Sequence, residues 1–390
     1  MTQQPDWNKI RKDFPVTENL AFFQSAGMSP VSTKVYETIR ESYYKLSQFG
    51  DISWEEDAEK IRELYGKVGK IINSSDEDLA FLPNTSVAFS LVALSLKNTF
   101  DEDFNIVTML DEFPASNIPF AGQGIDVKYV KPAPGNRYFI DDIMAAVDNK
   151  TKAIVTSYVN YSTGFRQNLE ILGKKAKDKG LLFIVNTTQG FPIFPVDVQK
   201  MHIDVMSASL HKWGCAGHVG SLFFTTAEYR KKFPAPFTGW LSVLPPKYDF
   251  IPVQKNEKFQ QFESARQYDF GTVNHQVLLG AKTAFEYMSN IGFKNIRGRI
   301  FEITDYLLEK LLNLPVEIAT PISKKEERTG IISVNIKGHD NKKVAEYLKE
   351  NKVFVAIRNQ NIRMSVNFFN DHNDVNYAIS ILEKYLSDNK

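Results

Sequence analysis

Residues 207–214 read SASLHKWG and directly follow the apolar pair Val205-Met206. The apolar pair predicts the end of a buried strand, and the polar residues after it predict a loop at the carboxyl end of that strand. Open α/β sheets bind ligands outside the carboxyl ends of their strands, so Lys212 lies where a ligand is expected. A partly desolvated lysine has a lowered pKa and can form a Schiff base with an aldehyde. A surface lysine in a loop is the plainer interpretation, and the flanking sequence has to decide between the two.

Short runs rich in Val, Ile and Leu recur through the first half of the chain. They occupy residues 79–82, 105–110, 127–130, 153–158, 181–185 and 205–208. The runs are almost continuously apolar rather than alternating, which is typical of parallel strands covered on both faces. Residues 170–179 lie between two of these runs and have the pattern of a crossover helix. We therefore predict a three-layer α/β domain with helices on both faces of a parallel sheet.

The pattern changes after about residue 262. Helices are predicted at 273–291, 295–312, 341–350 and 374–387, and strands at 331–336, 353–357 and 362–366. This succession predicts a smaller α+β domain. We expect a large domain made of residues 20–260 and a small domain made of residues 1–19 together with 261–390.

A polar turn, Asn84-Thr85-Ser86, separates the first apolar run from a helix-like run at 87–96. Backbone N–H groups at a helix N-terminus, together with two hydroxyls, form a ready anion site. An ordinary helix N-cap is the plainer interpretation of these residues taken alone. Farther along, residues 183–190 read FIVNTTQG, a strand that ends in polar side chains.

Composition excludes several classes of protein. The 390 residues are 43% hydrophobic and 24% charged with a net charge of +1, which predicts a globular protein without a nucleic-acid or membrane partner. The single cysteine, Cys215, excludes an intramolecular disulfide, and the six histidines show no metal-ligand spacing, so no metal site is expected. The first residues lack the pattern of a signal peptide, and a cytoplasmic location is the simplest expectation.

Taken in order, these segments resemble the aminotransferase class V family, fold-type I enzymes that depend on pyridoxal phosphate (PLP). In that family a strand ending in Asp-x-x-Gln is followed by Ser-x-His-Lys. Here Asn186 and Gln189 end the strand, and Lys212 follows Asn186 by 26 residues, which fits the family without a gap. The resemblance extends from residues 22–27 to residues 362–370 and implies the aspartate aminotransferase fold. The family includes cysteine desulfurases, kynureninase, isopenicillin N epimerase and serine-glyoxylate-type aminotransferases.

The resemblance also implies which residues hold the cofactor. Lys212 matches the lysine that forms the Schiff base and moves the proton at the substrate Cα. Gln189 matches the glutamine that binds the phenolic oxygen, Phe113 the aromatic residue that stacks on the ring, and Asn186 the residue at the ring nitrogen. The residues matched to the phosphate site are Thr85, Ser86, Ser209 and His211.

Three further residues concern the substrate and the assembly. Arg363 matches the arginine that receives the substrate α-carboxylate through its planar fork, with a surface salt bridge as the alternative. Tyr161 belongs to the segment 157–166, which resembles the epimerase branch, and we expect it near the cofactor oxygen or the substrate unless it is a core tyrosine. Thr272 resembles the residue that one subunit lends to its partner's phosphate site. The resemblance therefore implies a homodimer with a shared active site and an amino acid as substrate.

The sequence departs from the family at the ring nitrogen. Asn186 stands where the family has an aspartate, whose charge keeps the pyridine nitrogen protonated and makes the ring an electron sink. Three interpretations remain open. The enzyme runs chemistry that needs less delocalisation, such as racemisation or elimination; or other contacts to the ring compensate; or the protein binds PLP with little turnover.

A second departure concerns cysteine. Desulfurases of the family carry a nucleophilic cysteine on a loop shortly before the arginine matched by Arg363, and this chain has none there. Cys215 is expected to be a small buried residue. We therefore predict an aminotransferase, or an epimerase or lyase relative, and not a cysteine desulfurase. The alternative is a PLP-binding protein with degraded catalysis and a regulatory or scaffolding role.

Overall fold

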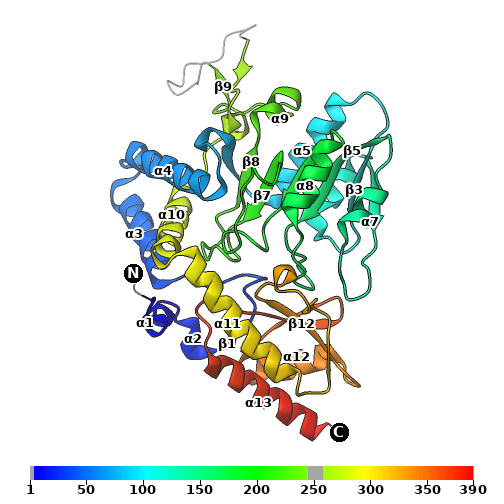
Figure 1. The fold of residues 1–390 in the computed structure, drawn as a ribbon. Coiled ribbons are helices and arrows are strands. Elements are labelled where there is room, and N and C mark those ends of the chain that lie inside the picture. The colour runs from blue at the N-terminus through cyan, green and yellow to red at the C-terminus, as the bar shows by residue number, and fades with distance from the viewer. Residues whose placement is uncertain (1–3, 245–257, 390) are drawn as a thin grey trace.

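A computed structural model describes residues 4–244 and 258–389 of the chain. Its largest sheet has seven strands in the order β2-β8-β7-β6-β5-β3-β4 (Figure 1). Of these, β8 runs antiparallel to both of its neighbours, and every other pairing in the sheet is parallel. The strands are β2 (Leu79–Leu82), β3 (Asn105–Met109), β4 (Asp126–Val130), β5 (Thr151–Ser157), β6 (Leu182–Asn186), β7 (Val205–Ser209) and β8 (Ser221–Thr225).

Alternate side chains of the central strands pack into two separate cores. Ile154 and Phe183 belong to one core, whereas Val155 and Ile184, the next residue along each strand, belong to the other. Helix α8 (Leu169–Asp178) contributes to the first core and α5 (Thr85–Thr99) to the second. Both faces of the sheet are therefore covered, which explains why its strands are apolar throughout. The predicted three-layer arrangement is confirmed.

Further helices and two short strands surround this sheet. They are α3 (Thr33–Phe49), α4 (Trp54–Ile72), α6 (Ile118–Gly122), α7 (Ile140–Ala145), α9 (Ala227–Lys232), α10 (His275–Ile291), β9 (Val243–Leu244) and β10 (Gln260–Gln261). Helix α10 packs against both α3 and α4. It begins at His275, directly after the side-chain cap formed by Asn274 and two residues after the predicted start at 273.

The C-terminal part forms a second sheet with the order β11-β12-β15-β14. A third core joins this sheet to the helices beside it and includes Ala21 and Phe23 from the N-terminal segment. The elements are β11 (Val316–Ile318), β12 (Ile331–Ile336), β14 (Ala356–Arg358), β15 (Asn361–Ser365), α11 (Phe293–Leu311), α12 (Asn341–Glu350) and α13 (His372–Asp388). Strand β1 (Ala21–Phe22) pairs in parallel with β13 (Val353–Phe354). The division of the chain at residues 19 and 260 stays a prediction.

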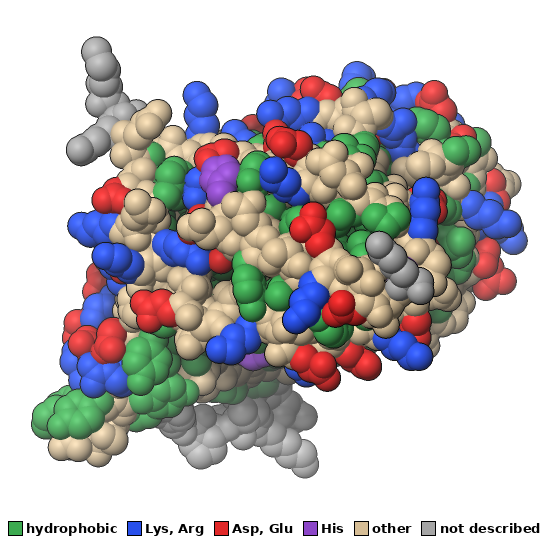
Figure 2. Space-filling view, turned by 90° about the horizontal axis from the view of Figure 1, so that it is seen from below, with side chains coloured by type: hydrophobic (Ala, Val, Ile, Leu, Met, Phe, Trp, Pro, Cys, Tyr) green, Lys and Arg blue, Asp and Glu red, His purple; other side chains and the backbone are tan. Residues whose placement is uncertain are grey.

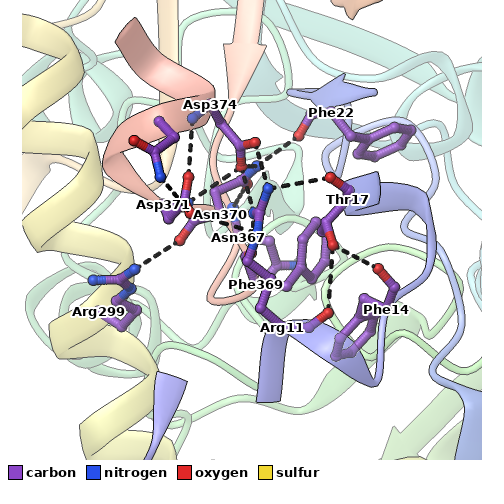
Figure 3. A network of polar contacts seen from close by, with 11 residues as sticks. Arg11, Phe14, Thr17, Phe22, Arg299, Asn367, Phe369, Asn370, Asp371 and Asp374 are labelled. Carbon is purple, nitrogen blue, oxygen red and sulfur yellow. Dashed lines mark hydrogen bonds and ion pairs between the residues drawn. The ribbon is translucent and has the colours of Figure 1, made fainter. Parts of the chain in front are cut away.

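A polar network ties the N-terminal helices α1 (Trp7–Lys12) and α2 (Val16–Asn19) to the start of α13 (Figure 3). Both terminal nitrogens of Arg11 donate to the carboxylate of Asp374 at 2.7 Å. The same guanidinium also donates to the carbonyl oxygens of Phe369 and Thr17. Asp374 is buried and completes a capping box with Asp371. The first turn of α13 is therefore held by a residue more than 300 positions away in sequence.

We expect Arg11→Met to lower the free energy of unfolding by roughly 2–4 kcal/mol, because it leaves the buried Asp374 carboxylate without its cation. Urea unfolding measures this change. Arg40→Met is the matched control, since the Arg40–Glu37 pair is about half exposed and should contribute less than about 1 kcal/mol. Equal losses in the two variants would contradict the role given to the network.

No helix within residues 4–244 and 258–389 combines the length and apolar character that crossing a membrane requires. Acidic and basic side chains are interspersed over the face seen from below in Figure 2. This mixing agrees with the balanced charge of the sequence.

Candidate active site

A cavity of about 280 Å³ lies at the carboxyl ends of the parallel strands. Its lining comes from the segments that follow β1, β2, β3, β5, β6 and β7, and from the hairpin formed by β14 and β15. The predicted residues that line it are Thr85, Ser86, Phe113, Tyr161, Asn186, Gln189, Ser209, His211, Lys212 and Arg363. A larger cavity of about 660 Å³ lies near Tyr138 and Lys324, but none of the predicted site residues lines it.

Lys212 is the central cation of the cavity. Desolvation by burial, followed by the positive charges of Arg363 and Arg358, lowers the pKa of its amine to about 7. Its Nζ lies 5.1 Å from the centroid of the Phe113 ring. A lysine with this pKa is partly neutral near pH 7, and the neutral amine is the form that attacks a carbonyl carbon.

Arg363 is buried beside Lys212 and has unused hydrogen-bonding capacity. Its Nη1 donates to the carbonyl oxygen of Tyr161 at 2.7 Å, whereas Nε and Nη2 have no partner in the described part of the chain. Burial, and then the charge of Arg358, lowers the pKa of the guanidinium to about 9. A buried cation with free donors matches a carboxylate ligand. The alternative of a surface salt bridge for Arg363 is therefore wrong.

Arg358 is a cavity residue that the sequence analysis missed. A hairpin turn of two residues, Asn359 and Gln360, joins β14 to β15, and both have positive φ angles of 46° and 65°. Ala356 lies opposite Arg363 in this hairpin, so Arg358, two residues farther along, points to the same face of the sheet. Side chains alternate between the two faces of a strand, so the spacing of Arg358 and Arg363 around a two-residue turn could have indicated that both lie on one face.

Hydroxyl groups gather at the N-terminus of α5. Thr85 Oγ1 lies 2.9 Å from Ser209 Oγ and 3.0 Å from Ser221 Oγ, and Asn84 caps the helix through Val87 N–H. The two explanations of the turn at 84–86 are therefore compatible, because the cap comes from Asn84 while Thr85 and Ser86 line the cavity.

His211 lines the cavity beside this cluster of hydroxyls. Desolvation, and then the charge of Lys212, lowers its pKa to about 4. The imidazole is therefore neutral at pH 7.

Asn186 and Gln189, which line the cavity with Lys212, already make hydrogen bonds to the protein. Asn186 Nδ2 donates to Ser116 Oγ at 3.0 Å, and its Oδ1 accepts from the backbone N–H of Thr188 at 3.1 Å. Gln189 Nε2 donates to the carbonyl oxygen of Ala26, and its Oε1 accepts from Trp213 Nε1. Each of these amide nitrogens keeps one further hydrogen for a ligand.

Tyr161 lies at the rim of the cavity rather than in the core. Its ring meets that of Phe113 edge to face, with centroids 5.4 Å apart. Thr272 is the one predicted site residue that the fold does not bring to Lys212 within the chain. It lines a different cavity with Trp54, Arg62 and Arg266.

The comparisons with known proteins agree with this geometry. A family model described as aminotransferase class-V matches residues 21–377. The chain belongs to the aminotransferase class-V family. Class-V aminotransferases are PLP-dependent enzymes, so the expected family, enzyme class and cofactor are confirmed.

The relatives of this class-V protein nevertheless correct its predicted reaction. A protein named probable cysteine desulfurase from Pyrococcus abyssi is 23% identical to it, over 96% of each chain. The solved structure of a cysteine desulfurase from Thermococcus onnurineus NA1 matches with a TM-score of 0.89 at 21% identity, over the whole of both chains. A cystine C–S lyase, C-DES, solved with its product cysteine persulfide, matches with a TM-score of 0.84 at 16% identity, over 95% of this chain and 98% of that one. These two likenesses confirm the fold type.

We predicted an aminotransferase, or an epimerase or lyase relative, and not a cysteine desulfurase. The exclusion of a cysteine desulfurase was wrong. Relatives that match nearly the whole chain are named cysteine desulfurases. The exclusion rested on the missing cysteine before Arg363, and the tight turn at 359–360 indeed replaces any loop there. It assumed, without a physical reason, that the thiol receiving the sulfur belongs to the chain.

The residues of the cavity fit PLP. Its described lining contains the three cations Lys212, Arg358 and Arg363, and no carboxylate. Uncompensated positive charge next to hydroxyls and a helix N-terminus suits a ligand with a phosphate group and a substrate with a carboxylate.

Proposed function

We propose that this class-V protein is a PLP-dependent enzyme that removes sulfur from a cysteine-type amino acid and passes it to a thiol outside the chain. The observation that carries the proposal is the pairing of Lys212, with its lowered pKa, and the free donors of Arg363 in one cavity without a carboxylate. The names of the relatives support the choice of a sulfur-containing substrate.

Lys212 would hold the cofactor through its amine and move the proton at the substrate Cα. PLP supplies, when bound, an electron sink that weakens the bonds at that carbon. Phe113 would cover one face of the ring. The residues proposed at the phosphate are Thr85, Ser86, Ser209 and the neutral His211.

Arg363 would receive the α-carboxylate through Nε and Nη2, the two nitrogens left without a partner. Its Nη1 bond to the Tyr161 carbonyl fixes the plane of the guanidinium.

The sulfur acceptor is proposed to be an external thiol, because Cys215 is unsuited to the task. Its side chain is 3% exposed, and burial raises the pKa of the thiol to about 12. Transfer breaks the Cβ–S bond of cysteine and forms an S–S bond, so cysteine and a thiol give alanine and a persulfide. The Cβ carbon is reduced and the transferred sulfur is oxidised by the same two electrons, so no further redox partner is needed.

We also propose a homodimer in which Thr272 completes the partner's phosphate site. Its place outside the Lys212 cavity of its own chain is compatible with this role. The cytoplasmic location stays a prediction.

The test is sulfur release from L-cysteine by the PLP-loaded protein, with and without an added small thiol. We expect alanine and persulfide to form in equal amounts, at a rate that rises with the concentration of the thiol. Cys215→Ala should release sulfur at nearly the rate of the unsubstituted protein. Loss of thiol-dependent release in Cys215→Ala, with its melting temperature unchanged, would show that the acceptor is Cys215, and absence of release from the unsubstituted protein would refute the proposed reaction.

A further inference from the structure

Glu112 has a buried carboxyl group that is hydrogen-bonded to Ser157, a residue that lines the Lys212 cavity. Its side chain is 5% exposed. One carboxylate oxygen accepts from the backbone N–H of Ser157 at 2.6 Å, and the other accepts from the Ser157 hydroxyl. The described partners of this carboxyl are uncharged, so no lysine or arginine accounts for its burial.

A chain of hydrogen bonds leads from Glu112 to the residue at the proposed ring nitrogen. Ser116 Oγ accepts from Asn186 Nδ2 at 3.0 Å, and hydrogen bonding by the Ser116 hydroxyl is one of the influences that lower the pKa of Glu112. Because Ser116 Oγ accepts from Asn186, its own hydroxyl hydrogen is left to donate to the Glu112 carboxylate. An amide that gives a hydrogen to a strong acceptor gains electron density on its own oxygen, so Asn186 Oδ1 becomes a better acceptor for an N–H group.

We propose that Glu112 is a positioning residue that polarises Asn186 through Ser116 and so favours a proton on the cofactor's ring nitrogen. An aspartate at position 186 would have the same effect directly. The inference rests on the proposed function, because it concerns the same cofactor. It selects one of the three interpretations of Asn186, namely compensation by other contacts to the ring.

The charge of Glu112 responds to pH in the neutral range. Desolvation raises its pKa to about 7, against the opposing hydrogen bonds from Ser157, Phe113 and Ser116. The titratable groups that feel its charge are the phenols of Tyr138 and Tyr161, which are themselves neutral there because burial raises their pKa. Above the pKa of Glu112 the carboxylate is ionised and favours a proton on the ring nitrogen, and below it this influence is lost.

A purely structural role for Glu112 is the competing explanation. Its two bonds to Ser157 join the segment after β3 to the end of β5, and losing them would loosen this edge of the cavity. The two roles differ in what they predict for the ring nitrogen. A structural role affects folding and cofactor affinity, whereas the proposed role changes the protonation of the ring in protein that is folded and loaded.

The experiment loads the protein with PLP carrying ¹⁵N in the ring and records the nitrogen chemical shift at a pH well above the pKa of Glu112. Glu112→Gln removes the charge but keeps the shape, and Ser116→Ala breaks the chain while keeping the charge. We expect both variants to move the resonance toward that of unprotonated pyridine, with a fall in the proton affinity of the ring nitrogen on the order of tenfold. Glu346→Gln, on the exposed face of α12, is the matched control and should leave the resonance in place.

The double variant Glu112→Gln, Asn186→Asp provides the converse test. A carboxylate placed directly at position 186 should return the resonance toward that of pyridinium. Unchanged resonances in loaded Glu112→Gln would overturn the role of Glu112, and if that variant does not fold, an unchanged resonance in Ser116→Ala has the same meaning. A wild-type protein that binds no PLP would instead refute the proposed function itself.

Discussion

Lys212→Ala is expected to lower the rate of sulfur release by on the order of 10³-fold or more, because it removes both the amine that holds the cofactor and the base at the substrate Cα. No other lysine lines the cavity among its described residues, so the loss should not be compensated. Single-turnover release of alanine measures the effect. The matched control is Lys343→Ala on α12, an exposed lysine that does not line the cavity.

The same substitution has a signature in stability. The pKa of Lys212 falls from 10.5 to about 7 on folding, so between these values the unfolded chain binds the proton and the folded chain does not. This group therefore makes the cofactor-free protein more stable as the pH rises from about 7 toward 10.5. Lys212→Ala should flatten that rise in urea titrations. Turnover at the wild-type rate in Lys212→Ala, with an unchanged slope of stability against pH, would contradict the assignment of Lys212.

Arg363→Met is expected to lower activity while it raises the stability of the folded protein. We expect kcat/KM for the amino acid to fall on the order of 10²-fold, since two charge-assisted hydrogen bonds to the carboxylate are lost. The free energy of unfolding without substrate should rise by about 1 kcal/mol, because a buried guanidinium with two unpartnered nitrogens disappears.

Two controls sharpen this prediction. Arg363→Lys keeps the charge but not the planar fork, so it should recover only part of the affinity. Arg358→Met tests the neighbouring cation, whose charge lowers the pKa of Arg363. An Arg363→Met protein that is destabilised yet binds its substrate normally would show that the arginine has a structural role instead.

The sheet was predictable because the apolar composition of its strands indicates that both of its faces are buried. Continuous apolar runs such as 153–158 and 181–185 can only be accommodated between two covered faces, and both correspond to central strands of the sheet. Strand β8 was not among the predicted strands, and nothing in its five residues indicates that it runs antiparallel to its neighbours. The order of residues from Asn186 to Lys212 likewise identified the family before any geometry was known.

Some properties of the site follow from its place in the sheet. Strand ends that are neighbours in a parallel sheet meet at one edge, so a polar residue after each run had a predictable position. Phe113, Asn186 and Lys212 line one cavity for this reason. The sequence pattern thus determined the fold class and the location of the site, and the resemblance to the family supplied most of its lining.

Other properties arise only when distant segments fold together. The two-residue turn at 359–360 aligns Arg358 with Arg363, and burial, followed by the charges of these two arginines, lowers the pKa of Lys212. The bonds from Glu112 to Ser157 and from Asn186 to Ser116 join three separate strand ends. Desolvation and charge pairing depend on distances in space, which spacing along the chain does not specify. The sequence therefore determined most of the residues that meet at the cavity, and the tertiary structure added Arg358 and decided the protonation states of the cavity residues.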